Sequence, residues 1–399
     1  MASFYAVILE LRKRSSMKNN SANDESVRSG LIPILIIIIY LSMECSCKHE
    51  GYNYSNYHEL TTPDNIIKLH ADVINKFDVN FLSHSSIIDG YLVFIDSKAD
   101  KLVKIIDLNS YELKKSFGNL GQGPDEFIGI NQIMPDPSNK RAFWIYDVST
   151  KNLKYYNIIN ILNNNFYPDR TIRLSTGKSG LCTQVLICPD RTILGVGLLW
   201  SGRVSVYDME GEFIRDIGKV PFIKKDKRFT AQHLHGFAGN IAYKPMSKEI
   251  YVATRLGTIV EKYSLDGDLL STLIGPVSFF PEYDIVPAGQ YYTMAYNNDT
   301  RFGYLDICYN EKLDRLFLLY SGKYQFHKDR NKRGFMGNTV FVLDERDEIV
   351  EQIELEKSIF RMTITEDGSS LFGLSEKEIL KYGLIDIHGM GVSSRVITH

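Results

Sequence analysis

Short apolar runs typical of β-strands recur from residue 65 onward, and no segment there keeps a helical period of 3.6 residues. Each repeat holds two such runs, separated by a polar loop and followed by a turn of Asp, Asn, Ser or Gly. The second run ends near six markers: Asp107, Asn157, Asp208, Ser264, Asp344 and Gly383. These markers lie 50, 51, 56, 80 and 39 residues apart. A repeat of about 40–50 residues built from strands alone is typical of propeller blades.

The repeat therefore predicts an all-β fold, a six-bladed β-propeller over residues 65–385. A four-stranded sheet cannot bury both of its faces alone, whereas sheets stacked around an axis bury each other. The first and last blades must also join, and residues 65–69 or residues 73–79 are the candidates for the closing strand. The long step from Ser264 to Asp344 indicates an enlarged fifth blade, and a seventh blade would need a hidden copy there.

The strongest apolar run in the chain is LIPILIIIIYLSM at residues 31–43. It is about 13 residues long, whereas a helix needs about 20 to span a bilayer. That length suits the apolar core of a secretory signal peptide, so we assign residues 1–47 to a signal-peptide region. Met17, followed by Lys18, is a more natural start than Met1.

Two cysteines, Cys45 and Cys47, follow this run in a segment that resembles the cleavage region of a bacterial lipoprotein. Cys47 is the favoured lipidation site because the small Ser46 precedes it, although Glu44 stands where Leu is usual. Cys45, with Glu44 directly before it, is the alternative. Two acyl chains on one cysteine anchor a protein firmly, at about 0.8 kcal/mol for each buried CH₂. A cleaved signal without lipid and an uncleaved anchor are the other interpretations.

The segments that flank the repeats carry little pattern. Residues 48–64 (KHEGYNYSNYHELTTPD) are polar and suit a flexible tether between membrane and propeller. Residues 386–399 are assigned to a C-terminal tail. The chain is thus expected to hold one folded domain between a tethered N-terminus and a short tail.

Charge and cysteine content exclude several classes of protein. A formal net charge of −2 argues against an obligate nucleic-acid binder, which would show a basic face. The propeller region has three cysteines, Cys182, Cys188 and Cys308, with no CxxC pair. The sequence therefore predicts no disulfide framework and no zinc site. Cys182 and Cys188 are expected to be buried free thiols.

No local motif for catalysis is present. The serine elbow GxSxG does not occur. His233 and His235 would point to one side of a strand as half a metal site, but no Cys or carboxylate lies at a companion spacing. Four carboxylates are interpreted as strand-end and turn residues: Asp89, Asp96, Asp147 and Asp208. We assign no catalytic residue, metal or cofactor, while a carboxylate pair gathered from different blades stays open.

Two insertions are candidate binding surfaces, because loops on a rigid scaffold often carry function. Residues 276–300 hold six aromatic candidates for sugar or protein contacts: Phe279, Phe280, Tyr283, Tyr291, Tyr292 and Tyr296. The alternative is that these rings cover one end of the propeller. Residues 321–337 and 224–228 are basic and would suit anionic glycans or lipid headgroups, or form solvated loops.

The segment Gly118–Phe127 (GNLGQGPDEF) resembles the GxxGxGPGEF element of NHL-type propeller repeats, with Asp125 in place of the usual Gly. Residues 319–323 and 340–344 resemble TolB-like six-bladed propeller lipoproteins of Gram-negative bacteria. The resemblance implies a structural connection between blades, with the Phe docked between them, made by these residues: Gly118, Gly121, Gly123, Pro124, Glu126 and Phe127. A phosphate loop would instead read GxxxxGK[ST] and open a helix.

We therefore expect an envelope protein, an outer-membrane lipoprotein that faces the periplasm or the surface. Its expected role is to bind or scaffold a protein or glycan partner, with a lipid anchor, no nucleic acid and no catalysis. The alternative is a polysaccharide hydrolase or lyase with a site assembled across blades in the central channel. A third possibility is an architectural subunit of a larger envelope complex.

Overall fold

The computed structural model describes residues 57–175, 180–199, 202–219, 235–289, 291–329 and 334–384. The chain divides into two units, Met1–Asn53 and Tyr54–His399, and every described residue belongs to the second. Almost every described element is a strand, and the short helix α3 (Ile158–Leu162) is an exception. The signal-peptide region, Cys45, Cys47 and the tail after residue 384 lie outside the described residues.

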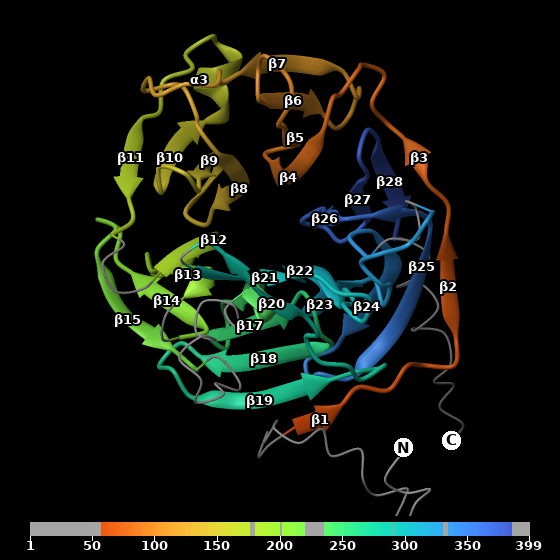
Figure 1. Ribbon diagram of the computed structural model, residues 1–399. Coiled ribbons are helices and arrows are strands. Elements are labelled where there is room, and N and C mark those ends of the chain that lie inside the picture. The colour runs from red at the N-terminus through yellow and green to blue at the C-terminus, as the bar shows by residue number, and fades with distance from the viewer. Residues whose placement is uncertain are drawn as a thin grey trace, which may run out of the picture. The chain divides into compact units, whose positions relative to one another are not determined.

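Six sheets surround a common axis, which confirms the six-bladed propeller (Figure 1). Blade 1 holds β4 (Leu82–Ile88), β5 (Tyr91–Asp96), β6 (Val103–Asp107) and β7 (Leu113–Phe117). Blade 2 holds β8 (Ile130–Asp136), β9 (Asn139–Asp147), β10 (Asn152–Asn157) and β11 (Arg170–Arg173). Blade 3 holds β12 (Gly180–Ile187), β13 (Ile193–Leu199), β14 (Val204–Tyr207) and β15 (Phe213–Ile217).

The other three blades also receive strands from the N-terminal part of the propeller unit. Blade 4 holds β16 (Gly239–Lys244), β17 (Glu249–Thr254), β18 (Ile259–Ser264) and β19 (Leu269–Ile274). Blade 5 holds β22 (Tyr304–Asn310), β23 (Arg315–Tyr320), β24 (Gly337–Leu343) and β25 (Ile349–Ile359). Blade 6 holds β26 (Arg361–Ile364), β27 (Ser370–Leu374) and β28 (Ile379–Gly383).

The six sequence markers all fall at the end of the third strand of a blade, or one residue after it. At four markers the reason is the tight turn to the fourth strand, where an Asp or Ser side chain can bond backbone amides two or three residues on. Asn157 instead caps helix α3, and Gly383 ends the last described strand of the chain. Asp107 Oδ1 accepts from the backbone N–H of Asn109 at 2.8 Å and of Ser110 at 3.1 Å. Asp208 Oδ1 accepts from the N–H of Glu210 at 3.0 Å. The recurring residue is therefore a turn signal.

The long step before Asp344 contains a hairpin, β20 (Asp284–Ala288) and β21 (Tyr291–Ala295). The hairpin is a separate two-stranded sheet between blades 4 and 5 in the chain. Together with the loop between β23 and β24, it accounts for the enlarged repeat without a further blade among the described residues.

Residues 57–73, which we call the N-terminal belt, follow the outer edges of blades 4, 5 and 6 (Figure 1). β1 (Tyr57–Glu59) pairs parallel with β19, and β2 (Ile66–Leu69) pairs parallel with β25. β3 (Asp72–Val73) pairs antiparallel with β28 and completes blade 6. Of the two candidates for the closing strand, residues 65–69 add to blade 5. The second candidate, residues 73–79, overlaps the actual closing strand β3 only at Val73. β1 lies within the range expected to be a tether.

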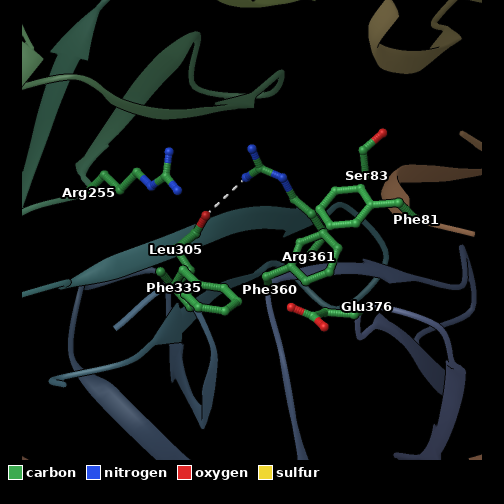
Figure 2. Close-up of a pocket in the computed structure, with 8 residues that line it drawn as sticks. All are labelled: Phe81, Ser83, Arg255, Leu305, Phe335, Phe360, Arg361 and Glu376. Atoms are coloured by element: carbon green, nitrogen blue, oxygen red, sulfur yellow. Dashed lines mark hydrogen bonds between the residues drawn. The ribbon is translucent and has the colours of Figure 1, made fainter. Parts of the chain in front are cut away.

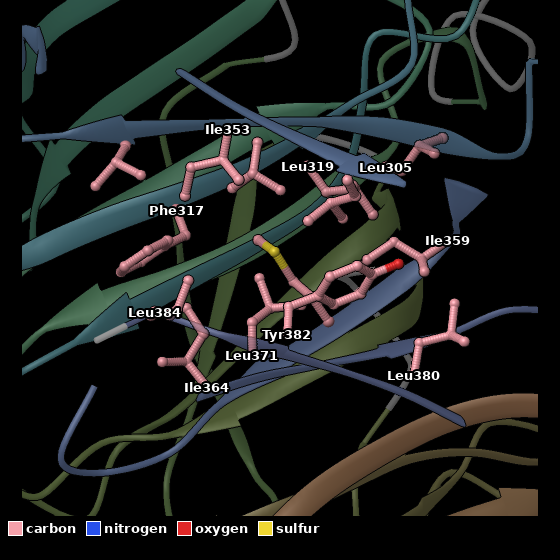
Figure 3. Packing of buried hydrophobic residues seen from close by; sticks show 14 of the residues in the cluster. Leu305, Phe317, Leu319, Ile353, Ile359, Ile364, Leu371, Leu380, Tyr382 and Leu384 are labelled. Carbon is pink, nitrogen blue, oxygen red and sulfur yellow. The ribbon is translucent and has the colours of Figure 1, made fainter. Parts of the chain in front are cut away.

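Hydrophobic clusters fill the spaces between neighbouring blades. Figure 3 shows the largest cluster, where Leu319, Ile353 and Ile359 of blade 5 meet Leu371 and Tyr382 of blade 6. All five side chains are nearly or fully inaccessible to solvent. Burial of this kind stabilises the fold by about 25 cal/mol per Å² of apolar surface. The blades therefore depend on one another for their cores.

The three cysteines of the propeller are free, and Cys182 and Cys188 are buried, which confirms the expected buried thiols. Burial raises the pKa of Cys182 to about 11 and that of Cys308 to about 12. Neither thiol is therefore a nucleophile at neutral pH.

Candidate ligand-binding site

The first strands of the six blades surround the propeller axis and carry one polar residue each at equivalent positions, a set we call the inner ring: His84, Gln132, Gln184, Asn240, Asp306 and Arg361. In four of these strands a β-bulge directly precedes the ring residue. A bulge redirects the side chain that follows it. The bulges thus explain why polar residues stand where simple alternation would not place them.

Five inner-ring side chains bond the backbone of the next blade. His84 Nδ1 accepts from the N–H of Ile133 at 3.4 Å, and Gln132 Oε1 from that of Val185 at 2.9 Å. The remaining bonds are Gln184 Oε1 from Ile241 N–H at 3.3 Å, Asn240 Nδ2 to Leu305 O at 2.8 Å, and Asp306 Oδ2 from Met362 N–H at 2.9 Å. These bonds join neighbouring blades around the axis and satisfy buried polar groups.

Arg361 is the exception in the inner ring. Its Nη1 donates to Asn240 Oδ1 at 2.8 Å, to the Leu305 carbonyl at 2.9 Å and to Asp306 Oδ1 at 3.2 Å. One nitrogen therefore joins blades 4, 5 and 6. Its Nε and Nη2 donate no hydrogen bond to the described residues, so one edge of the guanidinium group stays available.

A cavity of about 200 Å³ opens where the first strands of blades 1, 5 and 6 begin, and we call it the axial pocket. Figure 2 shows its lining residues: Phe81, Ser83, Arg255, Leu305, Phe335, Phe360, Arg361 and Glu376. They come from four blades, since the turn between β17 and β18 supplies Arg255 and the turn between β27 and β28 supplies Glu376. Apolar side chains make most of the wall.

Arg255 extends into the axial pocket from a braced turn. Its backbone N–H donates to the Ala238 carbonyl at 3.0 Å, and its own carbonyl accepts from Gly303 N–H at 2.8 Å. The guanidinium carbon lies 5.2 Å from the centre of the Phe302 ring, a cation–π contact. The side chain donates no hydrogen bond to the described residues. Burial lowers the pKa of Arg255, and the like charge of Arg361 lowers it further.

The ionisable inner-ring residues near the axial pocket are occupied by structural contacts. Burial raises the pKa of Asp306, whose two oxygens accept hydrogen bonds from Arg361 and Met362. Burial and the charge of Arg361 lower the pKa of His84 to about 3. His84 is therefore neutral at neutral pH and far from the pKa that suits a general base.

The lining of the axial pocket includes one carboxylate, that of Glu376. A glycosidase needs two carboxyl groups that flank the bond to be cleaved. Among the described residues, no group of three or more His, Cys, Asp and Glu is placed to hold a metal ion. His233 lies outside the described residues, so the structure does not place it relative to His235.

Among the described side chains, the predicted aromatic residues Phe279, Phe280, Tyr283 and Tyr296 do not belong to the lining of the axial pocket. Phe279, Phe280 and Tyr283 lie between β19 and β20, and Tyr291 and Tyr292 belong to β21. Tyr296 follows β21, and its ring centre lies 5.9 Å from that of Phe302, the ring that Arg255 contacts. The Arg301 guanidinium covers Phe279 at 4.3 Å.

The Gly118–Phe127 segment connects β7 of blade 1 to β8 of blade 2. The Gly121 N–H donates to the Phe127 carbonyl at 3.0 Å, and the Gly123 N–H donates to Glu126 Oε2 at 2.8 Å. The Phe127 ring is fully buried in the cluster between the two blades.

A lysine ammonium occupies the inside of this connection. Lys154 Nζ donates to the carbonyls of Pro124 at 2.8 Å and Glu126 at 2.5 Å. It also lies 4.7 Å from the Phe127 ring centre. Carbonyl oxygens therefore face the inside of the loop, an arrangement suited to a cation and unsuited to a phosphate.

The basic candidate segments are described only in part. Lys323 Nζ donates to Ser358 Oγ at 3.3 Å, and burial lowers the pKa of Lys323. Residues 224–228 and 330–333 lie outside the described residues. Within the part of the chain that the structure describes, no helix has the length and apolar character required to cross a membrane.

Sequence reasoning missed Arg255 and Arg361, the two charged residues that distinguish the axial pocket. Neither belongs to a local motif, because four blades supply the lining of the pocket. A signal for Arg361 does exist. Aligning the six first strands would place it with five uncharged or acidic residues, as the one strongly basic member of the inner ring.

Comparison with known proteins agrees with the fold. A family model described as TolB-like 6-blade propeller-like matches residues 77–367, which confirms the TolB-like resemblance. No curated protein matches the sequence.

Two solved structures illustrate the structural similarity. A crystal structure of a member of the DUF4221 family from Bacteroides vulgatus ATCC 8482 has a TM-score of 0.50 at 10% identity, covering 83% of this chain and 98% of that one. Kuenenia stuttgartiensis hydrazine synthase has a TM-score of 0.46 at 11% identity, covering 80% and 81%. At such low identity the first similarity shows the fold alone.

Proposed function

The chain belongs to the TolB-like six-bladed propeller family, and from that premise we propose that it is a binding propeller with its ligand site in the axial pocket. The proposed partner is a protein or a glycan of the cell envelope. No step of catalysis is assigned to the site.

One observation carries this proposal: the Arg255 guanidinium lines the axial pocket and donates no hydrogen bond to the described residues. An arginine in a pocket without an acceptor is poorly compensated, and a bound ligand can supply the acceptor. The neighbouring ionisable residues support binding over catalysis, because Asp306 is held by hydrogen bonds and His84 has a pKa of about 3.

The proposal is tested by binding to the full chain. Envelope glycans and peptides are screened against the wild type and against Arg255→Gln, and the variant is expected to lose at least tenfold in affinity for any ligand found. Arg141→Gln is a matched control, since Arg141 is exposed on blade 2 and pairs with Asp89. Cleavage of a polysaccharide by the full chain, seen as new reducing or unsaturated ends, would contradict a binding role and support the hydrolase or lyase alternative.

The envelope location is a second part of the proposal, and it rests on the N-terminal sequence. We expect an outer-membrane lipoprotein acylated on Cys47, with Cys45 as the alternative. Cells that express the chain are labelled with a fatty-acid analogue, and incorporation is compared between Cys47→Ala and Cys45→Ala. Loss of label in Cys47→Ala alone is the expected result. Absence of label from the wild type would reject the lipid anchor and leave the axial pocket untouched.

A further inference from the structure

We propose that the axial pocket binds a carboxylate that carries an apolar group, with the charge held by Arg255 and Arg361 and the apolar group held among three phenylalanines. This inference rests on the proposed function, which places the ligand in this pocket. The ligand can be a small free acid or the C-terminal residue of a peptide, which share this chemistry.

Arg361 supplies a fixed recognition edge. Its Nη1 is bound to three acceptors from blades 4 and 5, so the guanidinium plane is held in place before a ligand arrives. Its Nε and Nη2 donate to none of the described residues. Two adjacent N–H groups on one edge match the two oxygens of a carboxylate. Little side-chain freedom would be lost on binding, which favours affinity.

Arg255 supplies the second positive charge. In Figure 2 the Arg255 and Arg361 guanidinium groups approach each other across the axial pocket. Their like charges oppose each other, and this is one cause of the lowered pKa of Arg255. An anion between them would replace repulsion by attraction on both sides. The pair therefore selects a negatively charged ligand.

The rest of the wall selects an apolar group. Phe81, Phe335 and Phe360 line the axial pocket with Leu305, and its volume is about 200 Å³. An apolar cavity of about 150 Å³ is enough to hold benzene. The axial pocket therefore has room for one ring or one branched aliphatic group beside the charge.

Few groups in the axial pocket could satisfy a sugar. The polar lining residues besides the two arginines are Ser83 and Glu376. The buried Ser83 hydroxyl has no hydrogen-bond partner among the described residues, so it can bond one ligand oxygen. A uronate would bring several hydroxyls whose burial without partners costs free energy. An apolar monocarboxylate needs few such partners, so it is the best match to this lining.

The test is calorimetric titration of the full chain in detergent, with detergent alone as the reference. The probes are 3-phenylpropionate, its neutral amide, acetate and glucuronate. We expect 3-phenylpropionate to bind at least tenfold more tightly than the other three, because the amide lacks the charge, acetate lacks the apolar group and glucuronate lacks polar partners. Two peptides ending in Phe, one as the acid and one as the amide, form a second arm.

Variants connect the binding to the two arginines. Arg255→Gln should weaken 3-phenylpropionate binding about tenfold or more, whereas Arg141→Gln should leave it unchanged. Arg361→Gln should weaken 3-phenylpropionate binding to the same extent. Arg361 also joins three blades, so this variant could fail to fold, and the result for Arg255→Gln then decides. Tight binding of the peptide acid, of the small acid or of both supports the proposal and identifies the source.

Three outcomes overturn the inference. Equal affinity for 3-phenylpropionate and its amide would show that charge is not recognised. Preference for glucuronate would overturn the apolar part while leaving a binding role in the axial pocket intact. If no probe binds, and envelope ligands bind Arg255→Gln as well as the wild type, both this inference and the proposed site fail.

Discussion

His84 stands in the inner ring where blades 2 and 3 carry glutamines, and all three side chains accept a hydrogen bond from the next blade. The histidine differs because it can gain a proton. Burial and Arg361 lower its pKa from 6.5 to about 3, so it stays neutral in the folded protein at pH values where the unfolded chain binds a proton. Stability linked to His84 is therefore complete above pH 6.5 and is lost as the pH falls towards 3.

We predict that His84→Gln flattens the acid side of the stability curve. The glutamine side-chain oxygen can accept the hydrogen bond from the Ile133 N–H, and glutamine does not titrate in this pH range. Between pH 6.5 and 4 the wild type should lose about 1.4 kcal/mol per pH unit more than the variant, measured by denaturant unfolding. His58→Gln, at an exposed histidine in β1, is the control and should follow the wild type. Parallel curves for His84→Gln and wild type would show that His84 titrates normally.

At the residue scale, sequence reasoning succeeded for signals carried by a few consecutive residues. The aspartates that mark the third strands bond amides two or three positions away, so their role is visible locally. Arg255 and Arg361 meet in the axial pocket although they are 106 positions apart in the chain. Their proximity follows from blade stacking, which no short window of sequence contains.

At the element scale, the connection between blades 1 and 2 combines backbone conformation with packing. Gly118 has a φ of 75°, and a Cβ atom there would lie 2.7 Å from the Phe127 ring. Gly90, in the turn between β4 and β5, has a φ of 82° with no atom within 4 Å of a Cβ. Both glycines therefore need a positive φ, but only at Gly118 would a Cβ atom also collide with a side chain.

We predict that Gly118→Ala destabilises the protein more than Gly90→Ala does. Both substitutions place a Cβ in the left-handed region, at a cost of about 1–2 kcal/mol. Gly118→Ala must also displace a buried ring, which adds about 1–3 kcal/mol. Chemical denaturation of both variants measures the difference. Equal losses of stability would mean that Phe127 moves aside without cost.

Sequence reasoning missed β1 and offered β2 only as a candidate closing strand, because neither strand carries an apolar pattern. β1 is exposed at every residue, and β2 alternates only between exposed and half-buried positions. Both are held by backbone pairing to an edge, so their sequences need no apolar alternation. The second and third strands of the blades are largely buried, and their apolar runs made the repeat visible.

At the scale of the whole molecule, the ring closes through a short contact between the two ends of the propeller. Beyond the pairing of β3 with β28, Asn75 Oδ1 accepts from Ile379 N–H at 2.8 Å and Asn75 Nδ2 donates to the Lys377 carbonyl at 3.1 Å. One side chain thus binds the last blade over a separation of about 300 residues in sequence.

We predict that Asn75→Ala lowers the stability of the entire propeller by about 1–3 kcal/mol, because it leaves the Ile379 N–H without its partner. Thermal unfolding should remain a single transition at a lower temperature, since each blade depends on its neighbours for a core. Asn109→Ala, at an exposed turn residue, is the control. A separate early transition confined to blade 6 would instead show that the ring can open while the other blades stay folded.

The N-terminal belt gives the propeller a mechanical property. A force that pulls on the chain at Tyr57 reaches the pairings in chain order, so β1 leaves blade 4 and β2 leaves blade 5 before the closure by β3 bears any load. The 15 peptide units between Tyr57 and Asp72 would release about 50 Å of chain in that process. The N-terminal belt can thus release tension in two steps. A propeller pulled at its N-terminus would keep its ring closed while the belt detaches and extends.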